Sequence, residues 1–170
     1  GLFLEDVVEA AFHSVQVTAV FLLVTAVLLW VSERYSKKIN KMENLSAFDA
    51  FIIGCFQVLA IFPGLSRSGS TIAGGILRKL EREEAAKFSF LMSIPVMLGA
   101  GVMSINDLFA FSNLSEFLPI LLVGFVTSGI VGFISIHWLL KFLNKHKLGL
   151  FSIYCVIISL ITLVVSFFRT

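Results

Sequence analysis

Long apolar runs alternate with short polar segments along this sequence. Four runs approach the length of about 20 apolar residues that crosses a hydrocarbon core of about 30 Å; they cover residues 15–31, 85–105, 117–140 and 148–168. A fifth run, over residues 47–62, is shorter and stops at Pro63-Gly64. The pattern predicts an all-α integral membrane protein, a single membrane domain over residues 1–170, in which one apolar segment does not cross fully.

The basic residues gather in three of the polar segments, at residues 34–41, 78–87 and 141–147. By the positive-inside rule these segments face the cytoplasm. Because both flanks of the short run are then cytoplasmic, residues 47–80 are predicted to form a re-entrant helix–loop–helix, with its second helix over residues 70–80. The segment 106–116 contains Asp107 and Glu116 but no Lys or Arg, so it is expected outside, together with both ends of the chain.

Two further features concern the long helices. Pro95 removes a main-chain donor and predicts a kink in the run over residues 85–105. Small residues predict close packing between helices; they are Gly99, Ala100, Gly101, Gly124, Gly129 and Gly132.

Composition agrees with a membrane protein. Of the 170 residues, 58% are hydrophobic and 14% charged, against about 25% charged residues in a typical soluble domain. The net charge of +2 and the position of the basic residues between apolar runs exclude a nucleic-acid partner, which leaves membrane lipids as the surroundings. Cys55 and Cys155 lack metal or redox spacing and are interpreted as small packing residues.

The chemistry of the sequence is concentrated in the polar segment Pro63-Gly64-Leu65-Ser66-Arg67-Ser68-Gly69-Ser70-Thr71. Its hydroxyls can donate hydrogen bonds, and the guanidinium fork of Arg67 suits phosphate oxygens. Gly64 and Gly69 allow a tight turn and a close approach to a ligand. A helix that begins near Ser68–Thr71 would direct its N-terminal amides to the same place. These features together favour a phosphate group.

A plainer interpretation is a polar hinge, in which Ser and Thr cap helix ends and Arg67 extends to the membrane interface. The segment also differs from the Walker phosphate loop, because no Lys follows its glycines.

Residues 63–71 resemble the PGxSRSxxT signature of the bacterial undecaprenyl-diphosphatase family, of the bacitracin-resistance type. Gly54 and Gln57 before the loop and residues 85–95 after it fit the same family, and the resemblance runs from about Val15 to the C-terminus. It implies the second half of an inverted-repeat architecture in a bacterial plasma membrane. It also implies hydrolysis of a polyprenyl diphosphate, undecaprenyl diphosphate, to the lipid phosphate that carries cell-wall precursors.

The resemblance also implies roles for individual residues. Arg67 and Ser66 would be catalytic, with Arg67 holding the diphosphate and stabilising charge on the transferred phosphoryl group. The substrate-binding residues would be Gly64, Ser68, Gly69, Thr71 and Gln57.

The sequence departs from the family at the signature of its first half, an (E/Q)xxxE pair followed by a Pro-Ser-Ser loop and a histidine. Glu5 and Glu9 have the spacing, but Ala10-Ala11-Phe12-His13-Ser14 follows. We interpret Glu5 and Glu9 as a solvated interfacial face and His13 as a helix-end residue. The divalent cation that the family uses, Mg²⁺ or Ca²⁺, would then have its ligands in an N-terminal half outside this sequence, and no metal ligand is assigned within it.

Three functions remain open at this point. They are a polyprenyl-diphosphate phosphatase, a transporter that flips the lipid phosphate, and a truncated, inactive fragment. The oligomeric state also stays open, with a homodimer as one form.

Overall fold

The computed structural model describes residues 5–36, 40–109 and 114–169. Within those ranges the chain is helical, without a strand, and has one isolated bridge between Asn40 and Leu80. The elements are α1 (Glu5–Phe12), α2 (Val15–Arg34), the 3-10 helix η1 (Met42–Asn44), α3 (Ala47–Leu59), α4 (Arg67–Leu77), α5 (Arg82–Phe109), α6 (Leu114–Lys145) and α7 (Gly149–Arg169). The prediction of an all-α protein is confirmed.

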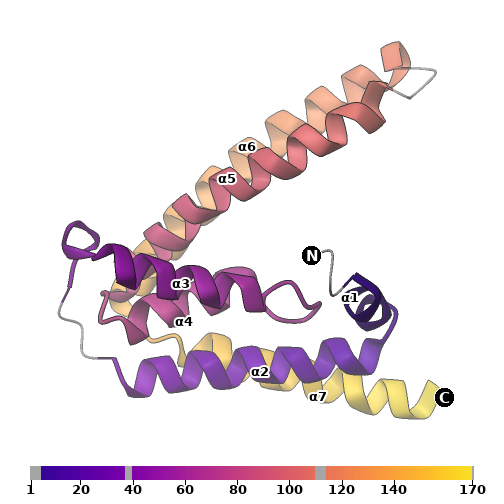
Figure 1. Cartoon of the computed structure of the whole chain (residues 1–170). Coiled ribbons are helices and arrows are strands. Elements are labelled where there is room, and N and C mark those ends of the chain that lie inside the picture. Colours follow the sequence, from indigo (N-terminus) through magenta and orange to yellow (C-terminus); the bar gives the residue numbers. More distant parts are fainter. Residues whose placement is uncertain (1–4, 37–39, 110–113, 170) are drawn as a thin grey trace.

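Four helices correspond to the four predicted crossings. Helices α2, α5, α6 and α7 each contain a stretch that is long and apolar enough to cross a membrane, whereas α3 has only 13 residues. Helix α5 is continuous through Pro95, and Figure 1 shows no sharp bend along it. The predicted kink is therefore not seen; the proline removes a single hydrogen bond from a helix of 28 residues.

Helices α2 and α7 lie side by side and run in opposite directions (Figure 1). Two buried serines of α7 fasten the pair: Ser152 donates its hydroxyl hydrogen to the carbonyl oxygen of Ala26, at 2.7 Å, and Ser159 does the same to Ala19, at 2.6 Å. Serines seven residues apart share one helix face, so both hydroxyls reach the same partner helix. Helix α1 and the end of α7 lie at the same end of the molecule, as the charge pattern predicts.

Helices α3 and α4 form a short hairpin beside α2 (Figure 1). Its base is closed by Arg78, whose Nε donates to Oδ1 of Asp49 at 2.6 Å. Asp49 also forms a capping box with Ser46 at the start of α3. Hydrogen bonds from Ser46 and then from Arg78 lower the pKa of the Asp49 carboxyl below its ordinary value of 3.8.

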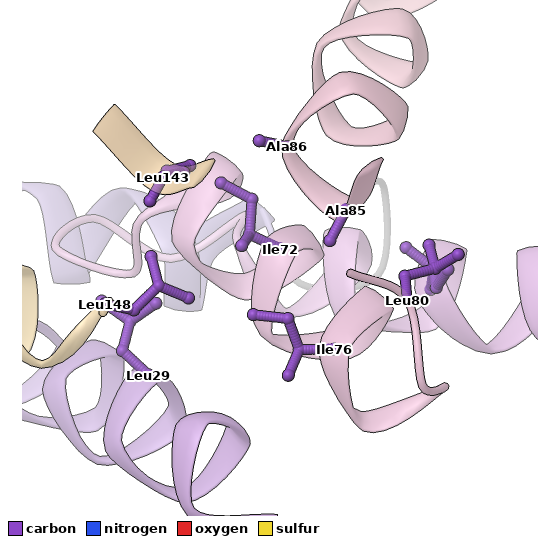
Figure 2. Close-up of a cluster of buried hydrophobic side chains, with 9 residues drawn as sticks. Leu29, Ile72, Ile76, Leu80, Ala85, Ala86, Leu143 and Leu148 are labelled. Atoms are coloured by element: carbon purple, nitrogen blue, oxygen red, sulfur yellow. The ribbon is translucent and has the colours of Figure 1, made fainter. Parts of the chain in front are cut away.

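The three basic segments meet at one end of the molecule. Oε2 of Glu33, at the end of α2, accepts from Nε of Arg82 at 2.9 Å and from the main-chain N–H of Leu148 at 3.2 Å. The main-chain N–H of Asn40 donates to the carbonyl of Lys79 at 3.0 Å. The three segments therefore lie at one end of the molecule, which agrees with the predicted common side; that this side is cytoplasmic stays a prediction. A cluster of buried apolar side chains, including Leu29, Ile76 and Leu80, packs beside them (Figure 2).

Helices α5 and α6 form a long hairpin that projects away from the other helices (Figure 1). Its large apolar side chains are mostly exposed, as expected for a surface in lipid. A Cβ built at Gly99, Gly101, Gly124, Gly129 or Gly132 would have nothing within 4 Å, and Ala100 is exposed. The predicted close packing through these small residues is therefore wrong within the described chain, because the hairpin turns them to its free surfaces.

Candidate functional site

The polar loop joins α3 to α4 and packs against the middle of α2. The ring of Phe62, just before the loop, stacks on Phe21 of α2 with centroids 4.9 Å apart. Thr25, to which the loop is hydrogen-bonded, is buried and lies near the midpoint of α2 (Val15–Arg34). If α2 crosses the bilayer, the loop reaches roughly half its depth. Irregular backbone at that depth occurs where it is covered by protein or lines a wet cavity.

Gly64 makes the turn possible. Its φ angle is 88°, in the region that favours glycine, and a Cβ at this position would overlap the carbonyl oxygen of Thr18. The loop therefore lies directly on the backbone of α2. This is the only described glycine with a positive φ.

The hydroxyl of Thr25 holds both sides of the turn. Its Oγ1 accepts a hydrogen bond from the N–H of Ser66 at 3.0 Å and lies 3.2 Å from the carbonyl oxygen of Gly64, to which it can donate. The same hydroxyl lies 3.2 Å from the carbonyl of Phe21 in its own helix. One buried threonine thus satisfies the main chain of a loop about forty residues away.

Ser66 is the N-cap of α4, which begins at Arg67, slightly before the predicted start. Its Oγ accepts from the N–H of Gly69 at 3.1 Å. A Cβ at Gly69 would lie 3.0 Å from this serine oxygen and 3.2 Å from Cγ2 of Thr25, so the glycine lets cap and helix approach closely. The N–H groups of Arg67 and Ser68, in the first turn, have no acceptor within the helix, and the helix dipole makes this end positive.

Three side chains around the loop have buried polar atoms without a hydrogen-bond partner in the described residues. These atoms are Nη1 of Arg67, Oγ of Ser70 and Oε1 of Gln57. A buried donor left unpaired costs about 1–3 kcal/mol, and more when it is charged. The unpaired guanidinium nitrogen therefore favours an anionic ligand at this place.

Thr71 lies one turn inside α4 and faces α5. It is buried, its Oγ1 donates to the carbonyl of Arg67 at 2.9 Å, and it lies 2.5 Å from Oγ of the buried Ser89. In this arrangement its hydroxyl joins α4 to α5. Binding of phosphate by Thr71 stays a prediction, and its position favours a role in holding the helix.

Ser68 lies on another face of α4. Together with Ser66 and Gly69 it lines part of a cavity of about 260 Å³ between α2, α4, α6 and α7. The lining of this cavity does not include Arg67. The guanidinium of Arg67 and the mainly apolar cavity therefore lie on different sides of the first turn of α4.

The family model described as "Bacitracin resistance protein BacA" matches residues 1–161 of this chain. The chain belongs to this family. With four helices long and apolar enough to cross a membrane, it is a multi-pass membrane protein.

Relatives in the family are named undecaprenyl-diphosphatase. The chain is 43% identical to one from Methanosphaera stadtmanae over 98% of its own length and 59% of the relative. It is 35% identical to one from Staphylococcus haemolyticus over 98% of its length and 58% of the relative. It spans less than two thirds of several such relatives, but covers 86% of one from Methanothermobacter thermautotrophicus, at 42% identity.

The residues of the loop do not fit a divalent cation. They offer hydroxyls, amides and a guanidinium, whereas Mg²⁺ and Ca²⁺ take carboxylate and carbonyl oxygens. No group of three His, Cys, Asp or Glu side chains that could hold a metal occurs in the parts of the chain that the structure describes. Glu9 is exposed on α1 and His13 is exposed directly after it, as predicted; the side chain of Glu5 lies outside the described set.

Sequence reasoning missed two residues of the site. Thr25 is an isolated hydroxyl in an apolar run, and Ser89 lies in the second crossing, over residues 85–105. A buried polar group in a membrane span needs a partner, so each could have been noted as having one. The sequence does not show which segment supplies that partner, because this depends on how the helices pack.

Proposed function

We propose that this protein is an undecaprenyl-diphosphatase, which hydrolyses undecaprenyl diphosphate to undecaprenyl phosphate and inorganic phosphate in the plasma membrane. The product is the lipid carrier for cell-wall synthesis. Membership of the family and the names of the relatives support the proposal. The geometry supports it because the loop offers anion-binding groups within an apolar surrounding.

The observation that carries the proposal is the buried, unpartnered Nη1 of Arg67 at the positive end of α4. A phosphate oxygen would pair with that nitrogen and with the free amides of the first turn. Ser66 and Ser68, on the neighbouring face, have hydroxyl hydrogens that can point to the same group. An anion of a lipid fits better than a soluble one, because the loop is surrounded by apolar helices.

In the overall reaction the oxygen of water forms a bond to the terminal phosphorus, one O–H bond of the water breaks, and the proton passes to solvent. The bond from that phosphorus to the bridging oxygen breaks, and its electron pair stays on the departing undecaprenyl phosphate. Charge grows on the bridging and terminal oxygens, where Arg67 and the amides of α4 would stabilise it. Such positioning and electrostatic stabilisation supply most of the catalysis of phosphoryl transfer.

We further propose that the activity depends on a divalent cation, Mg²⁺ or Ca²⁺, held by residues other than those of the loop. The expected result of adding EDTA is loss of phosphate release, with recovery when either metal is restored. Release that is unaffected by EDTA would contradict this part of the proposal.

The decisive experiment measures phosphate release from undecaprenyl diphosphate by purified protein in detergent. Arg67→Ala should lower kcat by about 10³-fold or more, since an arginine that stabilises this type of transition state contributes 10³–10⁵. Arg67→Lys should remain strongly impaired, because it keeps the charge but loses the fork. Arg34→Ala, at the exposed end of α2, is the matched control and should be unchanged.

Near-normal release by Arg67→Ala would refute the assigned role. Movement of undecaprenyl phosphate across vesicles without any phosphate release would instead identify a transporter. Lack of both activities in the folded wild-type chain would identify an inactive protein.

A further inference from the structure

The cavity of about 260 Å³ beside the loop has two chemically different parts of its wall. One part is formed by Ser66, Ser68 and Gly69, at the start of α4. The remaining wall is mainly apolar, with Leu22, Leu29, Ile72, Leu143, Leu148 and Phe151 among its residues. Leu29 of α2, Ile72 of α4, and Leu143 and Leu148 at the connection between α6 and α7 lie around one region in Figure 2.

The space could hold roughly nine groups of water size, at about 30 Å³ each. It is too small for a whole long lipid but sufficient for a short length of hydrocarbon chain. Tyr154, at its wall, is 61% exposed, so the space is open toward the lipid-facing side of α7.

We propose that this cavity binds the prenyl chain of the lipid whose phosphate groups bind at the start of α4, namely the isoprene units next to the headgroup. The proposal rests on the function proposed above and extends it to the apolar part of the substrate. The start of α4 adjoins the guanidinium of Arg67 on one side and the apolar wall of the cavity on another. A lipid bound at this helix end would place its phosphate groups at the first turn and the adjoining hydrocarbon along the cavity wall.

Along α2 the cavity extends from Leu22 to Leu29, and Thr25, which holds the loop, lies between them. On α7, Ser152 pairs with Ala26 and Ser159 with Ala19, so Cys155 lies toward the Leu22 end of the cavity. The start of α4 therefore lies beside the middle of the cavity, with apolar wall toward both of its ends.

The two cysteines provide a direct test with an internal control. Cys155 is buried in the wall of the cavity, whereas Cys55 is exposed on α3 and is absent from the cavity lining. Wild-type protein in phospholipid nanodiscs is treated with methyl methanethiosulfonate, and both sites are followed by mass spectrometry. Undecaprenyl phosphate should slow modification of Cys155 by about tenfold and leave Cys55 unchanged.

Inorganic diphosphate, which has no chain, should not protect Cys155, and neither should additional dioleoylphosphatidylglycerol. Equal protection by the phospholipid would show a general lipid site and overturn the proposal. Absence of protection by undecaprenyl phosphate would also overturn it. Protection is measured independently of hydrolysis, so a protein that releases no phosphate but shows protection would refute the proposed function and keep the chain-binding site.

A kinetic test covers the case in which Cys155 does not react. Cys155→Phe fills part of the cavity and should raise KM for undecaprenyl diphosphate about tenfold with kcat within twofold, while hydrolysis of isopentenyl diphosphate stays unchanged. Cys55→Phe is the matched control and should behave as wild type. An unchanged KM in a folded Cys155→Phe protein would contradict the proposal, even where phosphate release itself is normal.

Discussion

Thr25 of α2 accepts a hydrogen bond from the main-chain N–H of Ser66 at 3.0 Å, although 41 residues separate them. The same hydroxyl oxygen lies 3.2 Å from the carbonyl of Gly64. Since Ser66 caps α4, this threonine determines where the helix begins. The position of the groups that we propose to bind phosphate therefore depends on a residue that does not belong to their segment.

Thr25→Val should destabilise the protein and impair the site. The substitution keeps the shape of the side chain but leaves the Ser66 N–H and the Gly64 carbonyl without this partner, which costs about 1–3 kcal/mol. We expect a lower unfolding midpoint in detergent and a reduced rate of phosphate release. Thr25→Ser should retain most of both. Thr162→Val is the control, because the Thr162 hydroxyl is exposed and donates to the carbonyl of Ile158 in its own helix. An equal loss of stability and activity in Thr162→Val would contradict the role assigned to Thr25.

Gly64→Ala should displace the loop. An alanine at φ 88° is strained by about 1–2 kcal/mol, and its Cβ would overlap the Thr18 carbonyl. We expect loss of phosphate release together with lower thermal stability. Gly54→Ala in α3 has open space around the new Cβ and should be neutral or slightly stabilising, since alanine favours a helix. A fully active Gly64→Ala protein would show that the close contact with α2 is not required.

Lys79→Gly should stabilise the protein. Lys79 has φ 73° directly after α4, where the N–H of Leu80 bonds to the carbonyl of Gly75 at 3.0 Å. Glycine is the favoured residue at this position of a helix C-terminus, and the gain should be about 1 kcal/mol. Lys79→Ala removes the charge but keeps a Cβ, so it should give no gain. Equal effects of the two variants in a denaturant titration would assign the change to charge.

The base of the α3–α4 hairpin should loosen in acid. Hydrogen bonds from Ser46 and Arg78 lower the pKa of Asp49 below 3.8, so the ionised carboxylate stabilises the folded state above that value. This contribution is lost as pH falls through the lowered pKa, below about 3.8. The difference in unfolding midpoint between wild type and Asp49→Asn should therefore be constant near neutral pH and shrink below pH 3.8. A difference independent of pH would contradict this origin.

Much of the fold follows from the sequence because lipid imposes strong rules. Long apolar runs predict the helices α2, α5, α6 and α7, and the basic clusters predict that three segments meet at one side. The segment 63–71 stands out because its hydroxyls and Arg67 interrupt apolar sequence. Both its boundaries and the kind of ligand it suits can be argued from residue chemistry alone.

Contacts between helices could not be predicted in the same way. A helix that is apolar on every side gives no period that marks its packed face, so glycines such as Gly99 and Gly129 were expected at contacts and lie at free surfaces. The pairing of Thr71 with Ser89 joins residues of different helices, and no spacing rule connects them. The cavity is likewise made by four segments and is visible only when they are assembled.

The first turns of α4 are held from two directions, by Thr25 of α2 through Ser66 and by Ser89 of α5 through Thr71. The loop has thus lost its conformational freedom when the protein folds, before any ligand arrives. Binding of a headgroup then requires little further ordering of the main chain. The free energy of the new contacts therefore appears as affinity and is not spent on ordering the loop. Donors fixed in advance also need no reorganisation as charge develops during reaction. In this protein, preorganisation is a property of three helices acting together.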